Sequence, residues 1–70
     1  MAESVYKIIE LVGTSTESWE AAARSAVERA SSTLRDLRIA EVDKLDMTVD
    51  NNKVALYRAK IKLSFKYEEG

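Results

Sequence analysis

Two sets of charged residues in the second half of the chain carry the side chains most able to do chemistry. A basic set alternates through residues 58–66 and an acidic set runs through residues 41–50: Arg58, Lys60, Lys62 and Lys66, and Glu41, Asp43, Asp46 and Asp50. The plainest role is mutual pairing across neighbouring strands, where opposite charges stabilise a sheet. Two binding roles stay open. The basic set could bind an anion or phosphate, and the acidic set could bind a hard cation with carboxylates from several subunits around a symmetry axis.

Composition excludes several other kinds of chemistry. The chain has no histidine and no cysteine, which removes thiolate metal sites, common zinc sites and histidine-based acid–base catalysis. Eleven basic and twelve acidic residues give a net charge of −1. The aromatic residues interleaved with the basic set fall on the opposite face of their strand, so we expect no nucleic-acid binding. Paired carboxylates without histidine or a recognisable pocket do not indicate an enzyme.

The first half of the chain predicts a strand followed by a helix. Residues 5–12 are rich in Val, Ile and Tyr and are expected to form a strand that Gly13 ends, with apolar residues on both faces. The hydroxyl residues of "GTSTES" predict a helix start, with Thr14, Ser15 or Thr16 as the cap. An apolar seam then predicts a helix of about five turns; its members are Trp19, Ala22, Ala23, Ala26, Val27, Ala30 and Leu34. We expect Trp19 to anchor the core or an interface.

The second half predicts two long strands joined by a tight turn. Between residues 37 and 50 the apolar positions change from even to odd numbers, which predicts a bulge or bend near residues 42–45. "DNNK" at 50–53 predicts a hairpin turn, because asparagine tolerates positive φ. The last strand alternates most clearly, with one apolar side made of Tyr57, Ala59, Ile61, Leu63, Phe65 and Tyr67.

These elements predict a single α+β domain over residues 1–70, with the order β-α-β-β. A right-handed crossover makes the first two strands parallel, and the hairpin places the third strand between them, antiparallel to both. The first strand then lies at an edge with apolar residues on both sides and one helix to cover them. We therefore expect obligatory oligomerisation, with Ile9 or Leu11 facing a partner subunit.

The chain resembles the dodecin family. The resemblance covers about residues 5–69 and rests on "YKIIELVGTSTESWEAAARSAVERA", on a strand opening near "AEV", and on the final "YRAKIKLSFKYEE". It implies a protomer whose three-stranded sheet half wraps its helix, and a homododecamer that encloses a hollow spherical shell. It also implies a non-enzymatic storage protein, since most members bind flavins such as riboflavin, FMN and FAD.

The two flavin-contact positions that the resemblance implies are both substituted. A tryptophan opens the second strand in flavin-binding members, and Ile39 stands there. A glutamine on the third strand contacts the flavin ring, and Arg58, after Tyr57, stands there. Losing the indole removes a stacking contact of about 0.5–1.5 kcal/mol beyond burial, and guanidinium offers no acceptor. Flavin binding is therefore disfavoured and kept as an alternative. The other alternative is a calcium-binding or purely structural assembly, as in dodecin-like proteins with this arginine, although no EF-hand pattern is present.

The expected partners are other copies of the chain and a small ligand or ion. The N-terminal residues do not read as a signal peptide, and no stretch approaches the length of a membrane span. We expect a cytoplasmic protein that binds neither membrane nor nucleic acid.

Overall fold

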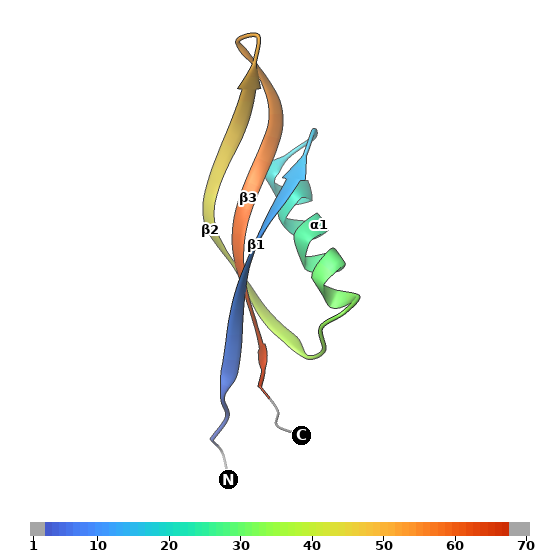
Figure 1. The fold of residues 1–70 in the computed structure, drawn as a ribbon, viewed down its shortest axis with the longest axis vertical. Helices are drawn as coiled ribbons and strands as arrows, with labels where there is room; N and C mark the ends of the chain where they lie inside the picture. The colour runs from blue at the N-terminus through green and yellow to red at the C-terminus, as the bar shows by residue number, and fades with distance from the viewer. Residues whose placement is uncertain (1–2, 68–70) are drawn as a thin grey trace.

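The computed structural model describes residues 3–67 and confirms the β-α-β-β order. Its elements are β1 (Tyr6–Ser15), α1 (Trp19–Ser31), β2 (Leu37–Asp50) and β3 (Lys53–Lys66). The strands form one sheet with the order β1-β3-β2, and β3 is antiparallel to both neighbours. The helix lies against one face of this sheet (Figure 1). The α+β class and the central place of the third strand are therefore confirmed.

The pairing of β2 with β3 contains the irregularities that the apolar pattern predicts. The register shifts between Val42 and Lys44, within the segment where a bulge is expected. The hairpin turn contains Asn51 and Asn52, whose φ angles are 52° and 62°. Asparagine tolerates this left-handed region, so the short turn is accommodated without glycine.

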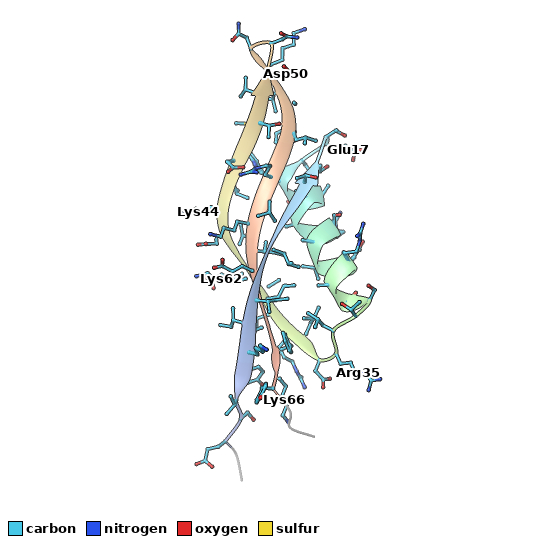
Figure 2. All side chains as sticks on the ribbon, in the orientation of Figure 1. Glu17, Arg35, Lys44, Asp50, Lys62 and Lys66 are labelled. Atoms are coloured by element: carbon cyan, nitrogen blue, oxygen red, sulfur yellow. The ribbon has the colours of Figure 1, made fainter. Side chains whose placement is uncertain are left out.

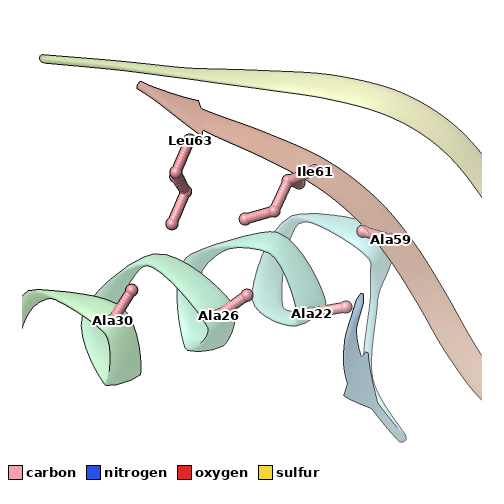
Figure 3. Close-up of a cluster of buried hydrophobic side chains, with 6 residues drawn as sticks. All are labelled: Ala22, Ala26, Ala30, Ala59, Ile61 and Leu63. Atoms are coloured by element: carbon pink, nitrogen blue, oxygen red, sulfur yellow. The ribbon is translucent and has the colours of Figure 1, made fainter. Parts of the chain in front are cut away.

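The core is formed by three helix residues and three residues of β3. Ala22, Ala26 and Ala30 face Ala59, Ile61 and Leu63, and all six are buried (Figure 3). The alanine side chains let α1 approach the sheet closely. Within residues 3–67, the largest fully buried side chains are Ile61 and Leu63, so the core of one copy is small.

Gly13 does not end the first strand, contrary to the sequence prediction. β1 continues to Ser15, and Gly13 is buried beneath the helix. A Cβ atom at this position would collide with the carbonyl oxygen of Ala22 and would lie 3.1 Å from Ala26 Cβ. Glycine is required here because the helix backbone passes directly over the strand.

The helix begins later and ends earlier than predicted. Its N-cap is Ser18, whose Oγ accepts a hydrogen bond from the backbone N–H of Ala21 at 3.0 Å. Ser15 Oγ accepts from the N–H of Glu17 and braces the loop before the cap. At the other end, the hydroxyls of Ser31 and Ser32 donate to helix carbonyls and compete with continued helical pairing.

The protomer is elongated because the hairpin extends beyond the other elements. The last residue of β1, Ser15, pairs with Tyr57, so the β2–β3 ribbon between Thr48 and Leu56 has no third strand. This ribbon projects past α1 and β1 (Figure 1). The extents are 55 × 20 × 16 Å, and the radius of gyration is 14.6 Å. A compact chain of this length would have about 11 Å.

Candidate functional site

The charged sets lie on the sheet face that α1 leaves bare, which we call the open face. Side chains alternate along β3, so the basic set points away from the buried Ala59, Ile61 and Leu63. Lys44 and Lys62 project from the side of the sheet opposite the helix (Figure 2). The open face is therefore where the predicted charge pairs can form.

Arg58 and Asp46 form a two-pronged ion pair across β3 and β2. Arg58 Nε donates to Asp46 Oδ1 at 2.7 Å, and Nη2 donates to Oδ2 at 3.0 Å. These hydrogen bonds and the guanidinium charge lower the pKa of Asp46 from its ordinary value of 3.8. The same contacts raise the pKa of Arg58. The paired forms of both side chains are therefore ionised at neutral pH.

Lys60 lies between acids from both neighbouring strands. Its Nζ is 3.8 Å from Glu10 Oε1 on β1 and 3.9 Å from Asp43 Oδ2 on β2. The next row of the sheet places Lys62 between Glu10 and Glu41 in register. The predicted cross-strand role is confirmed for Arg58 and Lys60, while Asp50 sits at the hairpin end opposite Lys53.

Ile39 and Arg58 are not brought together within one copy. Ile39 is 65% exposed and pairs with Ser64, whereas Arg58 pairs with Asp46. Six residues of β3 separate the two rows, which corresponds to about 20 Å at the usual rise of a strand. A small ligand that touches both positions would have to lie between copies.

Neither of these two side chains offers an aromatic ring or a hydrogen-bond acceptor. Ile39 supplies no aromatic surface for stacking. The guanidinium of Arg58 donates two hydrogen bonds to Asp46, and it has no acceptor atom for the edge of a flavin ring.

Trp19 links the start of the helix to the base of the hairpin and lies outside the cluster of buried residues. Its Nε1 donates to the backbone carbonyl of Asp46 at 3.0 Å. The ring also meets Tyr57 edge-on, with 5.2 Å between ring centroids and 73° between planes. These contacts fix the indole at the end of α1 next to β2.

A groove of about 300 Å³ lies beside Trp19, between α1 and β2. Ala23, Val42 and Leu45 line it, and Glu20 and Arg24 stand at its rim. The groove is not predictable from the sequence. The sequence shows that β2 carries apolar residues, but it does not show that the helix leaves them uncovered.

The apolar residues that β1 exposes are not the ones predicted to face a partner. Ile9 and Leu11 are partly buried and pack against the core beneath the helix. Ile8 and Val12 point to the open face and are 61% and 52% exposed. The helix packs on the face to which odd-numbered residues of β1 point, and this leaves the even-numbered ones bare.

Within residues 3–67, no cluster of three or more acidic side chains is placed to hold a metal ion. None of the helical structure in the same range has the length and apolar character of a membrane crossing.

The family model for dodecin matches residues 5–68. This chain belongs to the dodecin family. It is 49% identical to the calcium dodecin of Mycobacterium tuberculosis over 63 residues, covering 90% of this chain and 89% of that protein. It is 43% identical to the dodecin of Thermus thermophilus over 65 residues, covering 93% and 94%.

Solved structures agree with this assignment to the dodecin family. The dodecin of Streptomyces coelicolor superposes with a TM-score of 0.93 at 38% identity, over all of both chains. The structure of the calcium dodecin from Mycobacterium tuberculosis, described as having a novel calcium-binding site, superposes with a TM-score of 0.83 at 47% identity. That superposition covers 96% of each chain.

Proposed function

We propose that this dodecin-family protein is a non-enzymatic binding or storage protein for a small ligand or ion, and that it works as a homododecameric shell. The observation that carries the proposal is that one copy exposes apolar residues on both faces of its sheet. Ile8, Val12 and Ile39 lie on the open face. On the helix side of β2, α1 leaves four more apolar residues exposed: Val42, Leu45, Met47 and Val49.

Two opposed apolar surfaces require two different contacts. A single two-fold contact can bury only one of these surfaces, so a dimer would leave the other surface exposed to solvent. Two independent contacts on each copy generate a larger assembly, and closed symmetry limits its size. The resemblance to dodecins supports twelve copies around a hollow interior as the closed solution.

The binding sites would then lie between copies. Ile39 and Arg58 are about 20 Å apart along β3, as the strand rise indicates, and each stands on an exposed surface. Because Ile39 offers no ring and Arg58 is bound to Asp46, the ligand we favour is not a flavin. A shell that stores FMN or riboflavin is the alternative.

Light-scattering mass and a visible spectrum of the purified protein test this proposal together. We expect a colourless protein with the mass of twelve copies. A soluble monomer at micromolar concentration would contradict the shell. Absorbance near 370 and 450 nm with quenched flavin fluorescence would instead support the flavin alternative (both wavelengths are the usual flavin bands).

A pair of variants sharpens the flavin test. Ile39→Trp combined with Arg58→Gln restores both side-chain types that the resemblance implies, so we expect it to quench added FMN where the parent does not. Ile8→Trp with Arg58→Gln is the matched control, because Ile8 also pairs in the Ser64 row but lies on β1. Equal quenching by both variants would show that an added indole, and not its position, creates the binding.

Calcium is the second candidate ligand, and the identity of 49% to a relative named calcium dodecin favours it. The acidic set on β2 offers the oxygen ligands that calcium prefers. Residues 3–67 of one copy hold no such cluster of three, so we propose that the site draws carboxylates from several copies around an axis.

Thermal unfolding in calcium, in magnesium and in chelator tests the calcium site. A cation that binds only the assembled native state must raise the apparent Tm, so we expect calcium to raise it above both other conditions. Equal Tm values in all three conditions would indicate a purely structural assembly.

A further inference from the structure

We propose that one end of the open face binds an aliphatic carboxylate, a small molecule with a hydrocarbon chain and a single anionic head. The chain lies along Ile8, Ser64 and Ile39, which we call the aliphatic row, and the head lies at Lys66. The inference rests on the proposed function, because it names the class of ligand that the surface around Ile39 takes.

The aliphatic row crosses all three strands at one level of the sheet. Ile8 of β1 and Ile39 of β2 both pair with Ser64 of β3. Ile8 is 61% exposed and Ile39 is 65% exposed. Neighbouring strands lie about 4.8 Å apart, so the two isoleucines stand roughly 10 Å apart with the small serine between them. The row therefore offers two branched aliphatic side chains over a length that suits a short hydrocarbon chain.

The row favours a hydrocarbon chain over a planar ring. Ile8 and Ile39 have no π surface, so a ring that lies on them gains no stacking energy. Burial of hydrocarbon against these side chains needs no special orientation and stabilises in proportion to the apolar area removed from water. A chain that follows the row contacts both isoleucines at once.

The charges on the two sides of the row orient such a ligand. On one side, the next row of the open face contains Glu10, Lys62 and Glu41, so two acids and one base give it a net charge of −1. On the other side, Lys66 pairs with Tyr6, which is neutral. An anionic head is therefore repelled from the acidic row and attracted to Lys66.

Lys66 is the member of the basic set with no acid in its row of the sheet. Arg58 binds a carboxylate of β2, and Lys60 lies between two carboxylates. Lys62 stands between two acids in register, whereas Lys66 is exposed and takes part in no ion pair within residues 3–67. A single ammonium matches the one charge of a carboxylate better than the charge of about −1.5 to −2 on a phosphate.

Calorimetric titration of the assembled protein with decanoate, below its micelle concentration, tests the inference. We expect decanoate to bind several-fold more tightly than decanol, which has the same chain without the charge. Acetate has the head without the chain and should show no measurable binding. Decylammonium carries the opposite charge on the same chain and should bind more weakly than decanol.

Two variants separate the chain from the head. Ile39→Ser removes aliphatic surface from the row, so we expect it to weaken decanoate and decanol by the same factor. Lys66→Gln removes the charge, so we expect it to lower the affinity for decanoate to that for decanol and to leave decanol binding unchanged. Val12→Ser and Lys53→Gln are the matched controls and should bind as the parent does, because they make the same changes outside the row, at an exposed valine of the open face and at the hairpin.

The light-scattering mass of the same samples distinguishes this inference from the shell. An assembled parent that binds decanoate no more tightly than decanol, or decylammonium more tightly than decanoate, would overturn the inference and leave the shell intact. Equal binding by the parent and Lys66→Gln would also overturn it, and this comparison decides alone if Ile39→Ser changes the mass. A monomeric parent would overturn the shell. Decanoate binding by that monomer that still depends on Lys66 would uphold the inference, because the row lies within one copy, and its absence would overturn both.

Discussion

Asp46 connects three parts of the protomer through a single residue. Its carboxylate binds Arg58 on β3, and its backbone carbonyl accepts the indole N–H at the start of α1. The side chain that binds Arg58 thus belongs to the residue whose backbone binds Trp19. A substitution at this position can remove the ion pair and keep the indole hydrogen bond, because the latter uses the backbone.

We predict that Asp46→Asn lowers the Tm modestly at neutral pH, and that the difference from the parent disappears in strong acid. The folded-state pKa of Asp46 lies below its ordinary value of 3.8. The stabilisation from the pair is therefore fully present above that ordinary value and is lost as the pH falls through the lowered pKa. The effect is small because both side chains are about half exposed.

Thermal unfolding of the two proteins across acidic and neutral pH measures this difference. Asp50→Asn removes the same charge from the hairpin end, away from Arg58, and serves as the control for the change in net charge. A constant gap between the parent and the Asp46 variant at all pH values would show that the asparagine acts through packing instead of through the ion pair.

At the scale of the elements, the close contact between β1 and α1 depends on Gly13. The helix backbone at Ala22 passes over the strand at a distance that leaves no room for a Cβ atom. The small alanines of α1 and the glycine of β1 act together, since enlarging either side would separate helix and sheet.

We predict that Gly13→Ala destabilises the protein by about 1–3 kcal/mol, the usual cost of overpacking a tight core. Urea unfolding at fixed protein concentration measures it. Thr14→Ala, at the adjacent exposed position on the open face, is the control and should cost less. If the two variants unfold at the same urea concentration, the helix adjusts its position and the contact is less rigid than the structure indicates.

At the scale of the whole molecule, we expect the open face to form one of the contacts between copies. Ile8 lies there with 61% of its surface exposed, beside Ser64 and in the same row as Ile39. We predict that Ile8→Asp lowers the light-scattering mass, because a charge there would be buried without a partner. Ile8→Leu keeps an apolar side chain of similar size and should retain the parent mass. An Ile8→Asp variant with the parent mass would show that the open face near β1 is not an interface.

The element order, the central third strand, the bulge near residue 43 and the hairpin turn were all predictable from the sequence. They follow from local patterns: a period of two in strands, an alanine seam in the helix, and asparagines with positive φ at a turn. The helix ends were less predictable. Several adjacent hydroxyl residues could cap the start, and serine hydroxyls, not glycine or proline, mark the end.

Only the tertiary structure decided which surfaces are bare. The sequence shows apolar residues on both faces of β1, but the side on which α1 packs determines that Ile8 is exposed and Ile9 is covered. The same packing leaves apolar residues of β2 such as Leu45 and Met47 exposed and forms the groove beside Trp19. Likewise, Ile39 and Arg58 could be named from the sequence. Their separation along β3 and the ion pair between Arg58 and Asp46 depend on the strand register. Local periodicity determines where a side chain points relative to its own element. What then covers that side chain is a non-local property, because it depends on how distant segments pack.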